Sequence, residues 1–375
     1  MIKIGCITFH GSYNYGSSLQ TYALKTAVEN CFSNISYQVI NYRNEKQREM
    51  YKNIFEKKDL RSRYSRLFSL GRRGELESKK ELFECFFERF NLTRLFTTEN
   101  ELKESNLDFD YLICGSDQVW NVNATEFDWS YFLRFSDSGV KISYACSAGT
   151  KLLNYTNEQT SIIKNELKKF KSISVRDENT KKLIKQFGFD STICVDPTLL
   201  LDKIQWNNLI SESPKNLPYS DKPFILFYDL KRNKLNWRIA KYISKKLKMP
   251  LLITSVPFPR VISCSIGMKK NYSCGPIEFL NYLSKAALVL TSSFHGTVLS
   301  CILNKPFYVI NSSEDERLKS FINDVGIVGR NIDALPKNGN LLNDWENFCF
   351  DQVNQKIDVL REKSMTFLKG AIRNE

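Results

Sequence analysis

The sequence predicts an α/β protein with two Rossmann-like domains and a central cleft. Three observations lead to this fold class. The chain has 375 residues, more than one ordinary core needs and enough for two domains. Strand-like and helix-like patterns alternate from the N-terminus onward, as they do in parallel sheets with helical crossovers. A polar segment with three prolines, Ser211–Pro223, interrupts this alternation, which restarts beyond it and so indicates a linker.

The first domain is expected to cover residues 1–210. It opens with a strand, a loop rich in glycine, serine and asparagine, a helix and a second strand, which together form a βαβ unit. The expected strands are Ile2–Thr8, Tyr37–Tyr42, Phe109–Gly115, Lys141–Ala148, Ser172–Arg176 and Ser191–Val195. The expected helices are Leu19–Cys31, Thr156–Phe170 and Glu178–Phe187. These patterns predict a parallel sheet of five or more strands.

The second domain is expected to cover residues 211–345 and to repeat the same alternation. Its expected strands are Phe224–Asp229, Pro250–Ser255, Ala287–Thr291 and Pro306–Ile310. Its expected helices are Lys234–Lys246, Ile277–Lys285, His295–Leu303 and Glu316–Val325. A long helix is expected over Trp345–Lys369, and we assign residues 346–375 to a C-terminal helix for which crossing back to the first domain is one arrangement.

The net charge of +13 indicates an anionic partner, such as phosphate, carboxylate or an anionic lipid surface. The alternative is a solvated surface rich in lysine. Much of the excess lies between Lys46 and Lys80, where aromatic residues follow a helical period. We interpret residues from about 46 to 105 as a basic, partly exposed helical insertion that faces an acidic membrane or an anionic acceptor. Nucleic acid is not expected as a partner, because no recognised binding module is present.

Composition favours a soluble globular protein, with 42% apolar and 25% charged residues. No apolar run approaches the roughly 20 residues that span a bilayer, and the N-terminus lacks the pattern of a signal peptide. We therefore expect a cytoplasmic protein, with peripheral contact at the inner face of the membrane as an addition. The ten cysteines include no CxxC pair, which favours reduced thiols. The two histidines lie far apart in sequence and no ligand spacing accompanies them, so we expect no metal site. No cofactor is expected either.

The residues that follow strands are the candidates for a site, because ligands of open parallel sheets bind beyond the carboxyl ends of the strands. The segment Thr291–Thr297 (TSSFHGT) follows an apolar strand and opens a helix, whose free N–H groups and dipole attract an anion. A histidine at this turn, His295, is suited to proton transfer near neutral pH. The alternative is that Ser292 or Ser293 caps the helix and that His295 is structural.

Two further segments follow strands of the first domain. In Ser172–Asp177 a strand delivers Arg176 at its carboxyl end, where a guanidinium grips phosphate or carboxylate; the alternative is a surface charge beside a helix cap at Asp177. Cys114–Asn121 (CGSDQVWN) places Ser116, Asp117 and Gln118 after a strand, and here the alternative is a polar turn followed by a buried Trp120.

The first loop, Asn14–Gln20, resembles a phosphate-binding turn only loosely. It matches neither G-x-G-x-x-G nor the Walker pattern, so no nucleotide site is indicated by motif. Three basic residues near the end of the second domain, Lys305, Arg317 and Arg330, are candidates for lining a basic cleft, and each taken alone is typical of a surface charge.

Together these segments resemble the polysaccharide pyruvyltransferase family, in the family's order and over nearly the whole chain. The residues that carry the resemblance are Asn14–Leu24 (NYGSSLQTYAL), Gly115–Asn121 (GSDQVWN), Ile142–Gly149 (ISYACSAG), Ser174–Asp177 (SVRD), Val195–Leu201 (VDPTLLL) and Thr291–Phe307 (TSSFHGTVLSCILNKPF). The combination of GSDQVW with SFHG is specific, whereas each fragment alone is not.

The resemblance implies a GT-B-like fold, phosphoenolpyruvate as the donor substrate, and a sugar or lipid-linked oligosaccharide as the acceptor. The product it implies is a pyruvate ketal on a capsule, exopolysaccharide or cell-wall sugar. The family's histidine corresponds to His295, which would be the general acid and base, and its donor-binding arginine corresponds to Arg176. Asp117 would position or deprotonate the acceptor hydroxyl.

The remaining expected site residues divide between the two domains, with the acceptor on the side of the first and the donor on the side of the second. Some family members carry an arginine two residues before the histidine, and Ser293 occupies that position here. The charge of the donor must then be met elsewhere, for which Arg317, Arg330 and Lys305 are the candidates. The expected donor-binding residues are Arg176, Ser293, Phe294, Gly296, Thr297, Arg317, Arg330 and Lys305. The expected acceptor-binding residues are Asn14, Tyr15, Gly16, Ser17, Gln20, Ser116, Gln118 and Trp120.

Two other functions fit the same sequence. One is a GT-B-type glycosyltransferase that uses a sugar nucleotide, since a fold does not fix a function. The other is a basic, non-enzymatic scaffold of a membrane-bound assembly complex, in which the SFHG turn would be dispensable.

Overall fold

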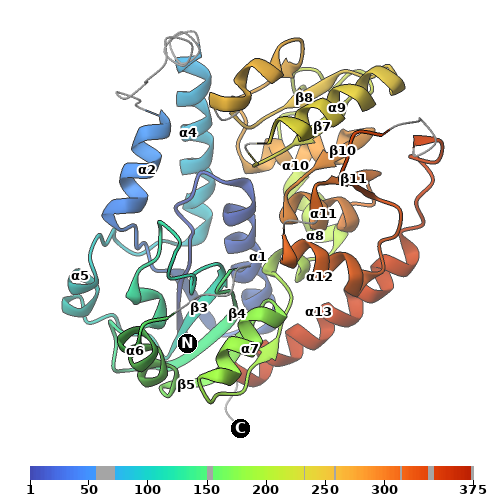
Figure 1. Cartoon of the computed structure of the whole chain (residues 1–375). Helices are drawn as coiled ribbons and strands as arrows, with labels where there is room; N and C mark the ends of the chain where they lie inside the picture. The colour runs from blue at the N-terminus through green and yellow to red at the C-terminus, as the bar shows by residue number, and fades with distance from the viewer. Residues whose placement is uncertain are drawn as a thin grey trace. The chain divides into compact units, whose positions relative to one another are not determined.

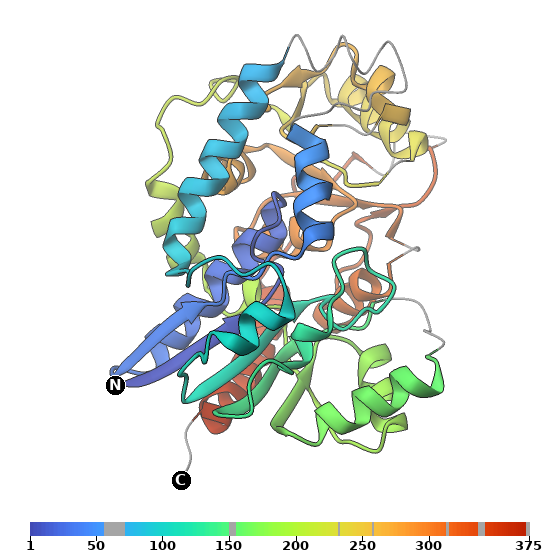
Figure 2. The ribbon, with the colours of Figure 1, turned by 90° about the vertical axis from the view of Figure 1, so that its left-hand side faces the viewer.

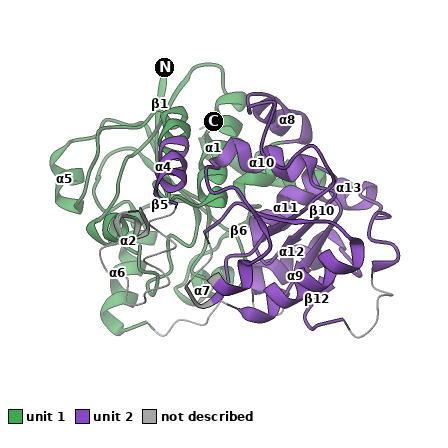
Figure 3. Ribbon diagram, turned by 90° about the horizontal axis from the view of Figure 1, so that it is seen from above, with its two compact units in different colours: residues 1–56, 84–201, 358–375 green, residues 57–83, 202–357 purple. Residues whose placement is uncertain are grey.

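The computed structural model describes residues 1–55, 72–149, 155–231, 233–256, 259–312, 315–336 and 342–372. The chain divides into two compact units, coloured separately in Figure 3. Unit 1 comprises residues 1–56, 84–201 and 358–375, and unit 2 comprises residues 57–83 and 202–357. Each unit is built around its own parallel sheet.

The sheet of unit 1 has six described strands, all parallel, in the order β2-β1-β3-β4-β5-β6. The strands are β1 (Ile2–Ile7), β2 (Ile35–Val39), β3 (Tyr111–Asp117), β4 (Val140–Cys146), β5 (Phe170–Val175) and β6 (Thr192–Ile193). The helices between them are α1 (Tyr15–Cys31), α6 (Asn157–Leu167) and α7 (Glu178–Gln186), with 3₁₀ turns η1 (Glu88–Phe90), η2 (Trp129–Phe132) and η3 (Pro197–Leu199). The path can be followed from blue to green in Figures 1 and 2.

The strands of unit 1 form a sheet because their apolar runs lose contact with water on both faces, as parallel strands do. Side chains of β3 and β4 such as Leu112, Ile113 and Ile142 are fully buried. Between β4 and β5 the register shifts, and Ala145 takes a φ of 49° there. The shift is a bulge just before the carboxyl end of β4, and it re-aims the residues that follow.

The sheet of unit 2 also has six described strands, all parallel, in the order β12-β11-β10-β7-β8-β9. The strands are β7 (Ile225–Tyr228), β8 (Leu251–Ile253), β9 (Lys269–Lys270), β10 (Leu288–Thr291), β11 (Phe307–Ile310) and β12 (Asn331–Ile332). The helices are α8 (Lys203–Ser211), α9 (Lys234–Leu247), α10 (Pro276–Lys285), α11 (Phe294–Ile302) and α12 (Glu316–Val325), with a 3₁₀ turn η4 (Pro259–Ser265). The strand β10 therefore lies between β7 and β11.

The described part of the expected basic insertion is helical except for residues 91–98, where Leu92 and Phe96 form isolated bridges to Val39 and Tyr42. Its helices are α2 (Glu45–Phe55), α4 (Arg73–Phe87) and α5 (Glu99–Glu104), and residues 56–71 lie outside the described residues. One of its lysines is not a surface charge, because Lys79 is buried in unit 2 and its Nζ donates to Thr254 O at 3.2 Å. Burial lowers the pKa of Lys79 to about 8, since an ammonium group loses its hydration there.

The last helix begins later than predicted. Helix α13 spans Asp351–Ile372, whereas the predicted helix began at Trp345. The preceding residues are not helical because Arg330 holds their carbonyl groups: its Nη1 donates to Trp345 O at 2.9 Å, and its Nη2 to Asp344 O at 3.3 Å and Asn347 O at 3.2 Å. Carbonyls gathered on one guanidinium are not available to a helical ladder. No helix of the described part of the chain is long and apolar enough to span a bilayer.

Candidate functional site

The carboxyl edge of the unit 2 sheet gathers the residues that follow β7, β10 and β11. Because these strands are parallel neighbours, the segments after Tyr228, Thr291 and Ile310 leave the sheet at the same edge. Helix α11 starts here directly after β10. Ser293 is its N-cap and accepts a hydrogen bond from Gly296 N at 3.5 Å, so the capping alternative is correct for this serine. His295 is the second residue of the helix and so lies in its first turn.

Gly296 is required by the close packing of this turn. A Cβ at Gly296 would lie 2.5 Å from Thr291 Oγ1 and 2.9 Å from Tyr228 Cδ1, which is closer than real Cβ contacts allow. The Thr297 hydroxyl donates to Ser293 O at 3.1 Å and is fully buried. Gly296 therefore permits the close packing of the turn, and Thr297 fixes the Ser293 carbonyl. Both were expected to bind the donor, and in the structure both determine the backbone conformation of the turn.

His295 is held at this turn by aromatic packing. Its ring is 8% exposed and meets Phe294 edge to face, with ring centroids 5.4 Å apart. Phe294 in turn packs against Phe321 of α12 at 5.8 Å. The helix that follows β11 therefore supports the first turn of α11, which limits the orientations open to the imidazole.

Sequence analysis did not identify Asp229, which directly follows β7. Its Oδ1 accepts hydrogen bonds from Ser292 Oγ and from Asn236 Nδ2, the latter at 2.9 Å, while its Oδ2 is buried without a hydrogen-bond partner among the described residues. Burial raises the pKa of Asp229, and the hydrogen bonds from Ser292 and Asn236, together with the nearby Lys231, oppose that effect. The available signal was its place at the end of an expected strand, the rule that had selected the other candidates.

Three basic residues that were expected to bind the donor have other positions or partners in the structure. Lys305 lies beyond the far end of α11, Arg330 holds backbone carbonyls, and Arg317 forms an ion pair with Asp315. Lys305 follows the C-terminus of α11, so the whole nine-residue helix, about 13 Å long, separates it from the N-terminal turn. Arg330 is 5% exposed, holds the carbonyls before α13 and stacks over Tyr308. Arg317 lies at the correct edge, at the start of α12, and binds Asp315 through Nε at 3.1 Å and Nη2 at 2.9 Å.

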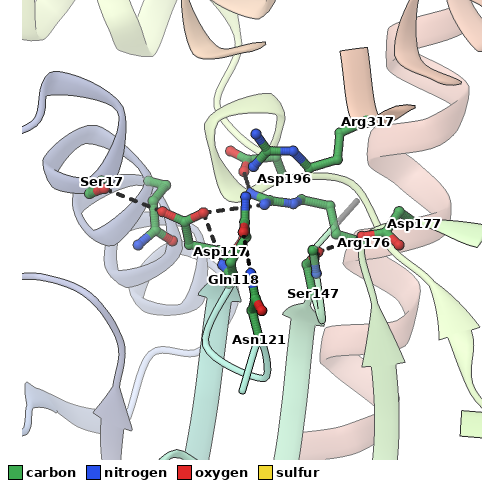
Figure 4. A network of polar contacts seen from close by, with 12 residues as sticks. Ser17, Asp117, Gln118, Asn121, Ser147, Arg176, Asp177, Asp196 and Arg317 are labelled. Carbon is green, nitrogen blue, oxygen red and sulfur yellow. Dashed lines mark hydrogen bonds and ion pairs between the residues drawn. The ribbon is translucent and has the colours of Figure 1, made fainter. Parts of the chain in front are cut away.

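In unit 1, Arg176 lies between two aspartates at the carboxyl edge of the sheet. It follows β5, and its side chain is 3% exposed. Its Nη1 donates to Asp196 Oδ2 at 2.8 Å and its Nη2 to Asp117 Oδ1 at 3.2 Å (Figure 4). Burial alone would lower the pKa of Arg176, but the two carboxylates outweigh it and raise the pKa. Arg176 is therefore a buried ion-pair centre, and the surface-charge alternative is wrong.

Asp117 ends β3 in a strained conformation. Its φ is 70°, which is uncommon outside glycine and is maintained where surrounding contacts determine it. Its carboxylate accepts hydrogen bonds from Arg176, from the Gln118 N–H at 2.9 Å and from the Ser17 hydroxyl at 3.3 Å. Ser17 comes from the first turn of α1, which Asn14 caps by accepting from Gly16 N at 2.9 Å. The expected acceptor loop and the GSDQVW segment thus meet at one carboxylate.

Asp177 has a separate role beside this cluster. It caps α7, accepting from Thr180 N at 2.8 Å, and also accepts from Ser147 Oγ at 2.6 Å (Figure 4). The capping alternative for Asp177 is therefore correct, and the cap ties the ends of β4 and β5 together.

Four of the expected acceptor-binding residues belong to the interior of unit 1. Gln20 is fully buried and donates to Thr8 Oγ1 at 3.0 Å. Trp120 stacks on Phe132 with ring centroids 5.2 Å apart and donates to Tyr131 O. Tyr15 is 2% exposed and Ser116 is fully buried, so neither side chain faces solvent. Of the expected acceptor-binding residues, Ser17 and Gln118 contact Asp117, and Asn14 caps the helix that carries Ser17.

The fold and this pair of strand-edge clusters define a GT-B-like α/β protein, as predicted. The sequence model of the polysaccharide pyruvyl transferase family matches residues 14–314. The chain belongs to this family, and the predicted resemblance is confirmed. The match includes Asp117, Arg176 and His295, and it ends before Arg317 and Arg330. No curated protein matches the chain.

Solved structures share the fold at low sequence identity. A protein from Listeria monocytogenes described as a UDP-N-acetylglucosamine 2-epimerase superposes with a TM-score of 0.57 at 13% identity, covering 96% of this chain and 91% of that one. The UDP-N-acetylglucosamine 2-epimerase of Rickettsia bellii gives 0.55 at 11% identity, covering 99% and 97%. The MnaA–UDP complex of S. aureus gives 0.52 at 13% identity, covering 98% and 91%. At these identities the likeness concerns the fold alone.

Proposed function

We propose that this protein transfers the pyruvyl group of phosphoenolpyruvate to two hydroxyl groups of a sugar, forming a pyruvate ketal during the synthesis of a surface polysaccharide. The observation that carries the proposal is His295 in the first turn of α11, in a chain of the polysaccharide pyruvyl transferase family. An enol phosphate is a small dianionic or trianionic molecule, and a helix N-terminus is suited to bind its oxygens.

The proposed reaction begins with a proton from His295 to the methylene carbon of phosphoenolpyruvate. A sugar hydroxyl attacks the adjacent carbon and gives up its proton, and phosphate leaves with the C–O bond electrons. A second hydroxyl then closes the ketal and releases the remaining proton. The imidazole is a suitable acid for the first step and a suitable base for a later one. The N–H groups of α11 stabilise the charge that develops on the departing phosphate.

Asp117 is the proposed base and orienting group for the acceptor sugar. Vicinal sugar hydroxyls need acceptors and donors held at fixed positions, and the Asp117 carboxylate is held by hydrogen bonds. Arg176 takes a different proposed role from the one its family resemblance implied. Because its Nη1 and Nη2 donors bind Asp196 and Asp117, we assign it to positioning Asp117.

The proposed acceptor is a sugar or a lipid-linked oligosaccharide used on the cytoplasmic side of the membrane. The excess of basic residues between Lys46 and Lys80 in the sequence is suited to an anionic lipid surface. Neither a metal nor a bound cofactor is part of the proposed reaction, in which phosphoenolpyruvate is a co-substrate.

The test is acceptor-dependent phosphate release from phosphoenolpyruvate, with mass spectrometry of the sugar product. We expect ketal formation with wild-type protein, a loss of at least about 100-fold in His295→Asn, since general acid–base catalysis contributes 10²–10⁴-fold, and a comparable loss in Asp117→Asn. The matched control is His10→Gln, which replaces the chain's other histidine, in unit 1. The variants are assayed at pH 8, and His10→Gln should keep its activity. Turnover of a nucleotide sugar in place of phosphoenolpyruvate would replace this proposal with the glycosyltransferase. Unchanged biological activity in a folded His295→Asn variant would favour the scaffold.

A further inference from the structure

A second group of polar side chains lies at the carboxyl edge of the unit 1 sheet, beside β1 and β2. Tyr13 lies in the loop after β1, and Arg43 lies in the segment after β2. Glu84 and Phe87 belong to the last turn of α4, in the part assigned to unit 1. Because β1 and β2 are parallel neighbours, the segments that follow them leave the sheet at the same edge. None of the four residues was expected at the site from the sequence.

Three of these side chains meet at one carboxylate oxygen, and we call Tyr13, Arg43 and Glu84 the Glu84 cluster. The Tyr13 hydroxyl donates to Glu84 Oε1, and Arg43 Nη1 lies 3.7 Å from the same oxygen. The buried ring of Phe87 supports the cluster from below. The ring of Tyr13 packs on it with centroids 5.7 Å apart, and the Arg43 guanidinium lies over it at 5.2 Å.

Arg43 has hydrogen-bonding capacity that its neighbours do not fill. Its side chain is 19% exposed, and its Nε is buried without a hydrogen-bond partner among the described residues. The 3.7 Å between Nη1 and Glu84 Oε1 exceeds the roughly 2.7–3.2 Å of an N–H···O hydrogen bond. A guanidinium carries five N–H donors, and polar groups that are largely buried are normally paired. The position of Arg43 therefore suits a ligand that brings an acceptor.

Glu84 offers the opposite kind of group beside it. Both contacts described above use Oε1, so Oε2 has no partner among the described residues, and the side chain is 41% exposed. Arg43 and Glu84 carry opposite charges, and the carboxylate would repel a phosphate or a carboxylate placed against the pair. A hydroxyl group donates and accepts at the same time, so a neutral sugar matches the pair better than an anion does.

The Glu84 cluster lies near Asp117 in the order of the strands. The order is β2-β1-β3, so the chain passes from β1 to β2 on one side and then to β3 on the other. Ligands of open parallel sheets bind at such a reversal. Ser17, four residues after Tyr13, donates to Asp117 at the end of β3. Neighbouring strands are about 4.8 Å apart, so β2 and β3 are separated by about 10 Å. That separation fits two linked sugar units better than two hydroxyl groups of one ring.

We propose that the Glu84 cluster binds a neutral sugar unit of the acceptor, next to the unit whose hydroxyl groups react at Asp117. Hydroxyl groups of this neutral sugar donate to Glu84 Oε2 and accept from the Arg43 guanidinium, while Tyr13 fixes the carboxylate. This role rests on the proposed function and makes the acceptor an oligosaccharide of at least two units. The cluster contributes binding alone, so no bond of the transfer reaction changes.

The experiment measures binding of the purified full chain to an array of neutral and anionic bacterial oligosaccharides and their component monosaccharides. Wild type is compared with Glu84→Gln and Arg43→Gln. The matched control is Glu29→Gln, at the end of α1 remote from Tyr13, since the Lys25–Glu29 pair is 16% and 38% exposed. Wild type should bind neutral oligosaccharides. Both cluster variants should bind them about 10- to 100-fold more weakly, as expected for lost hydrogen bonds to charged groups, and Glu29→Gln should not change.

Turnover assays separate binding from a structural role. In the cluster variants KM for the oligosaccharide should rise at least about 10-fold, whereas kcat and KM for phosphoenolpyruvate should stay within a few-fold of wild type. KM for a monosaccharide acceptor should be the same in variants and wild type. If the cluster only holds the end of α4, the melting temperature falls and the ratio of the two acceptor KM values does not change, which contradicts the proposal. Preference of wild type for anionic glycans, lost in Arg43→Gln, would overturn the assignment to a neutral sugar.

Failure of this proposal differs from failure of the proposed function. If wild type forms the ketal and both cluster variants keep their oligosaccharide affinity and KM, the Glu84 cluster has no such role and the transfer reaction stands. If binding of neutral sugars depends on the cluster but phosphoenolpyruvate yields no ketal, the sugar site stands and the reaction does not. If wild type binds no sugar of the array, the assignment of the cluster is overturned, and phosphate release from phosphoenolpyruvate decides the reaction separately.

Discussion

Replacing Arg176 with methionine should destabilise unit 1 strongly. The change removes one guanidinium from between two carboxylates, of which Asp196 is fully buried and Asp117 is 15% exposed at the side chain. Removing one partner of a buried ion pair costs about 3–5 kcal/mol, because a buried charge loses its compensation. In domains of this size each kcal/mol lowers the melting temperature by about 2–4 °C, so we expect a decrease of about 6–20 °C.

The assay is thermal unfolding of purified Arg176→Met at neutral pH, followed by circular dichroism. The matched control is Lys185→Met, which breaks an ion pair with Asp190 whose two side chains are 74% and 93% exposed. That pair should contribute less than about 1 kcal/mol. A decrease in Arg176→Met no larger than in Lys185→Met would refute the description of Arg176 as a buried ion-pair centre. A second variant, Arg176→Met with Asp196→Asn, should recover part of the loss, because it removes the carboxylate left without compensation.

Three more predictions concern single positions. Burial, with Arg43 nearby, lowers the pKa of His10 to about 4, so the stability of wild type should fall by about 3 kcal/mol as the pH drops from 6.5 to 4, and His10→Gln should lose this dependence. Buried Lys79 acts with the same sign at higher pH: its pKa of about 8 makes stability rise between pH 8 and 10.5, and Lys79→Met should abolish that rise in parallel denaturation curves. Gly296→Ala should reduce pyruvyl transfer at least 10-fold by displacing the α11 turn, whereas Gly370→Ala, with open space around its Cβ, should leave activity unchanged.

The sequence could predict the fold class because the strands are apolar and follow one another in a regular rhythm with the helices. The strands β9 and β12 were not predicted, since two residues carry no periodicity. The start of α13 was wrong for a different reason. Its helical pattern continues back to Trp345. However, Arg330, 15 residues earlier, donates to the backbone carbonyls that would accept hydrogen bonds in a helix.

The site could be predicted in part, by the same strand-end rule. Asp117, Arg176 and His295 each lie at or just after a carboxyl end of a parallel strand, as the rule requires. The sequence does not reveal which side chains contact these residues in the fold. Asp196 was not among the expected site residues, and its bond to Arg176 depends on two strand ends, 20 residues apart, meeting in the sheet.

The same reasoning applies to Lys305, the lysine that was expected to bind the donor. Lys305 lies close to His295 in sequence, but a helix turns ten residues of sequence into about 15 Å of distance. Lys231 lies 64 positions from His295 in sequence, yet β7 and β10 are neighbours, so the two residues leave the sheet at the same edge. In a parallel sheet the distance between functional groups is set by strand order and by which end of its strand each residue follows. Groups that act together with the α11 turn are therefore to be sought after β7 and β11, the two neighbours of β10 in the sheet.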